Sequence, residues 1–158
     1  SIQMASKTLL VVAHSPSPNT ERLRAAIVAG VNTADLCDLG LVVKTPFEAQ
    51  ASDVLSSDAV VLGTTENLGY MSGALKDFFD RVYNPCLEHT RAMPYAAYIR
   101  AGLDGTGTTR AITSITSGLG WRAVQPPLIL KGDWQDQFVD QCAELGAAMA
   151  IGLDSGIF

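Results

Sequence analysis

The stretch from Lys7 to Thr20, KTLLVVAHSPSPNT, decides how the chain is expected to fold. Its first half, Lys7 to Ala13, is a short, continuous apolar run with β-branched residues, the pattern of a strand buried on both faces of a parallel sheet. Thr20 then opens a segment with apolar residues at helical spacing: Leu23, Ile27, Val28 and Val31. A buried strand that leads through a polar loop into a helix is the opening unit of an alternating α/β domain.

The same alternation continues along the rest of the chain. Further strands are predicted over residues 41–44, 59–63, 95–101 and 127–130. Further helices are predicted over residues 47–55, 73–83, 106–118 and 135–153. Pro46 is expected in the first turn of the second helix, and Asn84-Pro85 is expected to end the third. Five strands that alternate with five helices predict one doubly wound α/β domain.

Composition and charge exclude several classes of protein. The 158 residues suit a single domain, and 47% of them are apolar, enough to fill a core. The net charge of -5 argues against an electrostatic nucleic-acid binder. Cys37, Cys86 and Cys142 are too far apart for a disulfide scaffold or a zinc site, so no metal site is predicted and a reducing compartment is expected.

The first residues of the chain give expectations about its location and its domain boundary. No apolar run near the start approaches the ~20 residues of a membrane span, so no membrane association is expected and a cytoplasmic location is predicted. Residues 1–3 precede Met4 and are interpreted as the remnant of an expression tag. The single domain is therefore expected to span residues 4–158.

The loop after the first predicted strand is rich in neutral hydrogen-bond donors. Hydroxyls and one amide stand just before the helix, at Ser15, Ser17, Asn19 and Thr20. Unpaired N–H groups and the positive end of a helix favour an anion there, and the absence of Lys and Arg indicates a phosphate held by neutral donors. The loop has neither a Walker nor a dinucleotide-binding glycine pattern. The alternative is an ordinary helix cap with turn-forming prolines.

A second stretch, from Gly63 to Arg81, reads GTTENLGYMSGALKDFFDR and follows the third predicted strand. Together with SPSPNT at residues 15–20, it resembles the phosphate loop and flavin-ring loop of flavodoxin-like proteins. The resemblance is nearest to FMN-dependent NAD(P)H:quinone reductases and NADPH-dependent FMN reductases, and it covers the chain from Met4. It implies a flavodoxin-like, three-layer fold, with a five-stranded parallel sheet in the order 2-1-3-4-5 and helices on both faces.

The resemblance also implies which residues bind FMN. The phosphate would be bound by Ser15, Ser17, Pro18, Asn19 and Thr20. The ribityl chain and the ring would be lined, partly through main-chain groups, by Thr64, Thr65, Glu66, Asn67, Leu68 and Gly69. The third loop would complete the pocket with Ala101, Gly102, Asp104 and Gly105. The chain departs from the family at Thr65, where proline is usual, and near Leu68, where an aromatic residue is expected.

The function implied by the resemblance is that of an NAD(P)H-dependent FMN oxidoreductase. Hydride would pass through flavin N5 to a quinone or a similar small-molecule acceptor, in a homodimer or homotetramer, and no catalytic side chain is assigned. A flavodoxin-type electron carrier and an FMN-free regulatory or scaffold domain remain as alternatives. Arg100 is interpreted as a solvated strand-end residue, and Trp121 and Trp134 as packing or interface residues.

Two other classes with the same topology are excluded by the residues. A low-molecular-weight phosphatase needs a Cys-x5-Arg loop after the first strand, and the chain has none. A response-regulator receiver needs a phosphorylatable Asp after the third strand, where this chain has Thr64 and Thr65.

Overall fold

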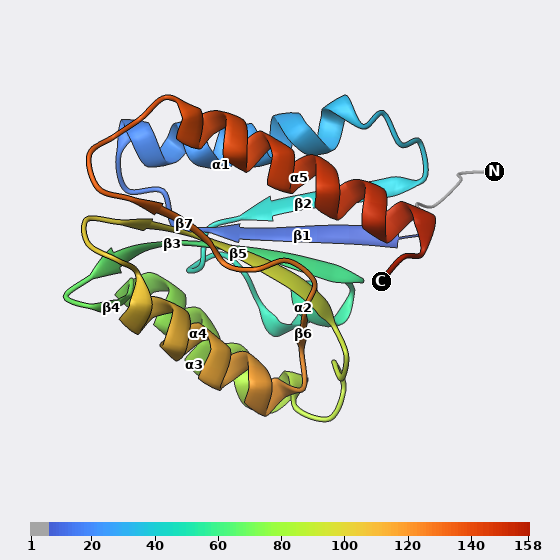
Figure 1. The fold of residues 1–158 in the computed structure, drawn as a ribbon. Coiled ribbons are helices and arrows are strands. Elements are labelled where there is room, and N and C mark those ends of the chain that lie inside the picture. Colours follow the sequence, from blue (N-terminus) through green and yellow to red (C-terminus); the bar gives the residue numbers. More distant parts are fainter. Residues whose placement is uncertain (1–6) are drawn as a thin grey trace.

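The computed structural model describes residues 7–158, which form three layers (Figure 1). A central sheet carries α1 (Pro18–Thr33) and α5 (Gln137–Ser155) on one face. The other face carries α2 (Ala51–Leu55), α3 (Gly73–Cys86) and α4 (Thr106–Leu119). The interpretation of residues 1–3 as a tag remnant lies outside the described residues.

The sheet has the predicted parallel order. Its main strands are β1 (Lys7–Ala13), β2 (Leu39–Lys44), β3 (Ala59–Asn67), β5 (Pro94–Ala101) and β7 (Leu128–Lys131). They lie in the order β2-β1-β3-β5-β7, and every pair among them is parallel. Two short strands are additional: β4 (Tyr70–Met71) pairs antiparallel with β3, and β6 (Arg122–Ala123) pairs with the start of β5. The predicted doubly wound α/β architecture and its strand order are confirmed.

Two predicted helix boundaries are wrong. Residues 45–49 form a turn in which the main-chain N–H groups of Glu48 and Ala49 both donate to Thr45 O, so α2 begins only at Ala51. The Asn84-Pro85 pair does not end α3, which runs to Cys86. Proline lacks one N–H group, and in the last turn this removes only one hydrogen bond. The helix ends where Leu87 N donates to Tyr83 O.

The third strand is longer than predicted. It was expected to end at Gly63 in a polar loop, but it continues to Asn67 and returns as a hairpin. Leu68 and Gly69 form the two-residue turn, and both have positive φ angles, 53° and 76°. Two central residues with positive φ are characteristic of a type I′ turn, whose twist matches that of the strands beside it. The segment expected to be a polar loop is therefore β structure.

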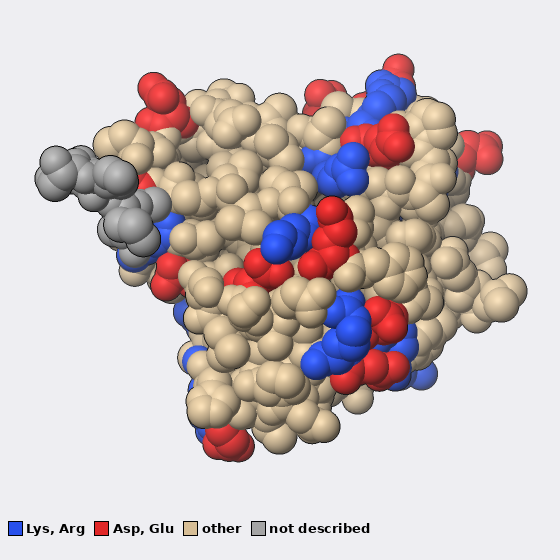
Figure 2. Space-filling view, turned by 180° about the vertical axis from the view of Figure 1, so that it is seen from behind, with Lys and Arg blue, Asp and Glu red and all other residues tan. Residues whose placement is uncertain are grey.

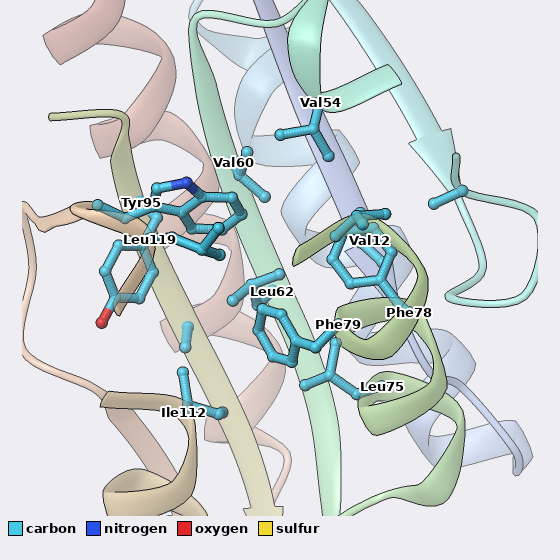
Figure 3. Close-up of a cluster of buried hydrophobic side chains, with 14 of the residues drawn as sticks. Val12, Val54, Val60, Leu62, Leu75, Phe78, Phe79, Tyr95, Ile112 and Leu119 are labelled. Carbon is cyan, nitrogen blue, oxygen red and sulfur yellow. The ribbon is translucent and has the colours of Figure 1, made fainter. Parts of the chain in front are cut away.

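The core is divided by the sheet into two clusters. On the side of α3 and α4, Leu62 of β3 packs against Phe78 and Phe79 of α3, with Tyr95 of β5 close by (Figure 3). Trp121 closes this cluster and is only 6% exposed, which confirms its prediction as a packing residue. Its indole N–H donates to the buried Thr90 hydroxyl across 2.8 Å.

The second cluster lies between the sheet and the pair α1 and α5. The two helices touch through their backbones because each contributes a glycine at the crossing. A Cβ atom on Gly30 would overlap the carbonyl oxygen of Ala143, and one on Gly146 would overlap that of Ile27. The first and last helices are therefore in fixed positions relative to each other.

Charged side chains of both signs are interleaved on the face seen from behind (Figure 2). On α3, Lys76 pairs with Asp80 across 2.6 Å, and Arg81 pairs with Asp77 across 2.8 Å. Lys44 of β2 pairs with Asp53 of α2 across 2.8 Å. On this face the acidic surplus of the chain is not gathered into one acidic surface.

Candidate functional site

The carboxyl ends of β1, β3, β5 and β7 meet at one edge of the sheet, at the left of Figure 1. The three loops predicted to bind the cofactor follow β1, β3 and β5, so the structure brings them all to this edge. A fourth loop, residues 132–136 after β7, joins them there. Such an edge is where open α/β sheets bind ligands.

The first loop ends in a helix cap made by two predicted phosphate-binding residues. The Ser17 hydroxyl accepts a hydrogen bond from Thr20 N (3.2 Å), and Ser17 N donates to the Thr20 hydroxyl (2.9 Å). The Thr20 side chain is buried and donates to Ser17 O (3.0 Å). The cap was the alternative function considered for this loop, and it is present. The Ser17 hydroxyl also lies 2.8 Å from the Thr20 hydroxyl, so both side chains are engaged in the cap, whereas Pro18 and Asn19 are exposed.

Ser15 lies beneath this cap, next to the sheet. Its hydroxyl oxygen is buried and has no hydrogen-bond partner among residues 7–158. The Tyr98 hydroxyl is also buried without a hydrogen-bond partner among these residues, and Tyr98 is only 2% exposed. Burial raises the pKa of the Tyr98 phenol, and the neighbouring Ser15 hydroxyl opposes part of that rise. Tyr98 lies against Gly63, where any side chain would overlap its ring.

The end of β3 sends its side chains alternately to the two faces of the sheet. The Thr65 hydroxyl is on the face of α1 and is buried, with no partner in the described part of the chain. Thr64 points to the opposite face, where its hydroxyl accepts a hydrogen bond from Ser72 N (3.0 Å). Glu66 is on that face too and accepts from the Thr108 hydroxyl of α4 (3.3 Å). Of these three predicted residues, only Thr65 presents its side chain to the α1 side.

The hairpin turn and the third loop form an exposed rim at the same edge. Asn67 and Gly69 are exposed, and Leu68 is fully exposed at the tip of the hairpin. In the third loop Ala101 is buried, whereas Gly102 is exposed. Asp104 accepts a hydrogen bond from Thr106 N (3.0 Å), which lowers the pKa of its carboxyl. Gly105 has a φ of 71°, the left-handed conformation that glycine adopts without strain.

Sequence reasoning missed a stack of side chains at this edge. Trp134, in the loop after β7, contacts two guanidinium groups, with Arg22 of α1 at 5.1 Å and Arg100 of β5 at 5.9 Å from its ring centroid. Arg100 also lies over the ring of Phe138, at 5.1 Å. The interpretation of Arg100 as a solvated strand-end residue is therefore wrong. Its position two residues after the buried Tyr98, on the same face of the strand, was the available signal.

His14 lies just after the end of β1, at the start of the first loop. His14 N donates to Gly63 O (2.9 Å), and partial burial lowers the pKa of the imidazole. Between residues 7 and 158 there is no cluster of three or more His, Cys, Asp or Glu side chains arranged to hold a metal ion. No helix in that range is long and apolar enough to cross a bilayer.

Comparison with known proteins identifies the fold. No protein-family model and no curated protein sequence matches the chain. Among solved structures, a flavodoxin from the domain Archaea superposes with a TM-score of 0.78 at 19% identity, covering 92% of this chain and 98% of that one. The flavodoxin WrbA-like protein from Agrobacterium tumefaciens gives 0.74 at 16% identity, covering 95% and 99%. An oxidoreductase from Corynebacterium diphtheriae gives 0.67 at 18% identity, covering 96% of each chain. The chain is a flavodoxin-like protein in its fold.

Proposed function

We propose that this chain binds FMN at the carboxyl edge of its sheet and acts as an NAD(P)H-dependent oxidoreductase on a small acceptor such as a quinone. The observation that carries the proposal is a group of buried hydroxyls without partners at that edge: Ser15, Thr65 and Tyr98. Leaving a buried hydroxyl unpaired costs about 1–3 kcal/mol, so such groups are rare unless a ligand satisfies them. A phosphate at the N-terminus of α1 would supply acceptors for Ser15 and Tyr98, and the ribityl chain would supply them for Thr65.

The residues present fit FMN. The Ser15 hydroxyl and the Asn19 N–H at the start of α1 would hold the phosphate, and the cap made by Ser17 and Thr20 would fix the loop around it. Thr65 and the loop from Gly102 to Gly105 would flank the ribityl chain and the ring. The bound flavin would supply the redox chemistry, and the protein would bind, orient and shield it from water.

Exposed apolar side chains around the proposed site favour a reductase. Leu68 and Leu103 are 106% and 80% exposed, and Tyr70 is 40% exposed. An apolar rim of this kind fits a planar co-substrate, or a second copy of the chain, better than it fits the charged surface of an electron-transfer partner. A homodimer or homotetramer is accordingly part of the proposal, and light scattering on a sizing column tests it.

A flavodoxin-type electron carrier is the second candidate, because flavodoxins are among the structures with the same fold. The apolar rim of Leu68, Tyr70 and Leu103 argues against a carrier, because the surface that docks an electron-transfer partner is usually charged. The third candidate, an FMN-free domain that keeps only the fold, requires the buried hydroxyls to remain unsatisfied.

The test begins with a titration of FMN into the purified protein, followed by absorption and fluorescence. A shifted flavin band and quenched emission at stoichiometric FMN are expected, and FMN that stays free at tens of micromolar would exclude a flavoprotein. Oxidation of NADH and NADPH by the loaded protein is then measured with and without a quinone. A carrier would fail to oxidise either nucleotide while still accepting electrons one at a time from a chemical reductant.

A further inference from the structure

We propose that Tyr98 and Arg100, both on β5 and outside the three cofactor loops, complete an anion site under α1 that selects a phosphomonoester over an uncharged ligand. The inference rests on the proposed function, because it concerns the same edge of the sheet. It goes beyond the proposed function because the first loop has only neutral donors, whereas Arg100 would add a positive charge and Tyr98 a buried donor below the loop.

The register of the sheet places these residues beside the first and second loops. Tyr98 pairs with Gly63, and Arg100 pairs with Thr65, in the parallel ladder between β3 and β5. Tyr98 belongs to the cluster covered by α1 and α5, and Arg100 lies over Phe138 of that cluster, so both side chains are on the α1 face. Thr65 and Arg100 are therefore neighbours on that face, in the row directly above Gly63 and Tyr98.

Tyr98 forms the floor of the proposed site. Its ring occupies the space left by Gly63, and its hydroxyl reaches Ser15 below the cap of α1. Both hydroxyls are buried without a hydrogen-bond partner within residues 7–158. A helix N-terminus alone does not make an anion site. The Tyr98 phenol near it is only 2% exposed and has no hydrogen-bond partner within residues 7–158, so an anion there would satisfy a buried donor.

Arg100 supplies the charge. Its Nη1 donates to the carbonyl oxygens of Ala101 (3.0 Å) and Leu130 (3.1 Å), and its guanidinium lies against the edge-to-face pair of Trp134 and Phe138 rings. These contacts fix the group in one position, half-buried. In the described chain Arg100 has no ion-pair partner among the carboxylates.

The acid that contacts this stack, Asp136, is already engaged. Asp136 accepts from the Trp134 indole (3.1 Å) and pairs with Arg22 (3.4 Å). The guanidinium of Arg100 is thus a fixed positive charge without its own counter-ion, beside the unsatisfied Thr65 hydroxyl. A partly buried cation of this kind is neutralised best by an anionic ligand. FMN carries a dianionic phosphate, whereas riboflavin has the same ring and no charge, so Arg100 is expected to distinguish the two.

The experiment compares FMN and riboflavin binding by fluorescence titration in the wild type and four variants. Arg100→Met is expected to weaken FMN binding about tenfold or more while leaving riboflavin binding unchanged. Arg100→Lys should retain part of the preference, and Tyr98→Phe should weaken FMN binding by a smaller factor. Arg110→Met, an exposed cation on α4, is the matched control and should change neither. An equal loss of FMN and riboflavin affinity in Arg100→Met would mean a purely structural role and would overturn the inference.

Inorganic phosphate provides a measurement that does not depend on flavin. Phosphate should raise the melting temperature of the wild type more than chloride at equal ionic strength, and Arg100→Met should abolish the difference. If phosphate stabilises the wild type but FMN does not bind, the proposed function fails and the inference stands. If FMN binds the wild type and Arg100→Met alike, the inference fails and the proposed function stands. Binding of neither ligand overturns both.

Discussion

Gly107, in the first turn of α4, lies directly against Gly69, in the turn of the β3–β4 hairpin. A Cβ atom on Gly107 would overlap the carbonyl oxygen of Gly69. One residue further along α4, the Thr108 hydroxyl donates to Glu66 of the same hairpin (3.3 Å). The second and third loops of the candidate site are therefore a single connected unit.

Gly107→Ala is expected to separate the two loops. The added methyl group has to displace main-chain atoms, which costs about 1–3 kcal/mol of unfolding free energy and should weaken FMN binding with it. Gly73→Ala is the matched control, because Gly73 also lies in the first turn of a helix but has open space around it. Urea unfolding measures both variants, and equal stabilities for the two would contradict the contact.

Thr90→Val should destabilise the fold through Trp121. The indole N–H of Trp121 donates to the Thr90 hydroxyl in a fully enclosed position, and valine has the same shape without an acceptor. The unsatisfied N–H is expected to lower the free energy of unfolding by about 1–3 kcal/mol. Thr113→Val, at an exposed position on α4, should have little effect. Chemical denaturation followed by tryptophan fluorescence makes the comparison.

The three thiols should differ in reactivity. Cys37 is exposed, whereas Cys86 and Cys142 are buried. Burial raises the pKa of Cys86, and it raises the pKa of Cys142 to about 12, so little of either is present as the reactive thiolate at neutral pH. A thiol reagent such as DTNB should titrate one cysteine quickly in the native protein and all three after denaturation. Rapid native reaction in Cys37→Ser would show that a buried thiol is accessible.

Stability should fall as the pH is lowered below about 6.5 because of His14. Burial lowers the pKa of His14 in the folded protein, so the unfolded chain takes up its proton first as the pH falls. The unfolded state then binds more protons than the native state, and stability decreases between the unfolded and the folded pKa values. His14→Gln should reduce this dependence in urea titrations at pH 7.5 and 5.5. The exposed His89→Gln serves as control, and an unchanged slope in His14→Gln would assign the effect elsewhere.

The apolar pattern predicted the order of strands and helices, because buried parallel strands such as Val60 to Leu62 have to be apolar on both faces. The hairpin could not be predicted in the same way. Thr64 to Asn67 is polar, and Leu68 adopts a positive φ angle that leucine rarely does, so only Gly69 marked the turn. Pro85 was misjudged because its effect depends on how many hydrogen bonds of the helix remain beyond it.

The candidate site was predictable where its residues are close in sequence, and not where they come from different elements. Ser15 and Ser17 were predicted as phosphate ligands because they precede one helix. Arg100 and Trp134 were missed because their stack requires the registers of β5 and β7 and the approach of α1. Tyr98 was missed because its ring fills the space beside Gly63, and Gly63 lies on a neighbouring strand that is distant in sequence.

The glycine contact between α1 and α5 also bears on how the protein is made. During synthesis α1 leaves the ribosome early, but the surface against which Gly30 packs belongs to the last helix, Gln137–Ser155. Until that helix has emerged, the α1 side of the sheet has only one of its two covering helices, and the C-terminal half of α1 lacks its packing partner. A ribosome-stalled chain that stops before Gln137 should therefore be protease-sensitive in α1, whereas the full-length chain should be protected there.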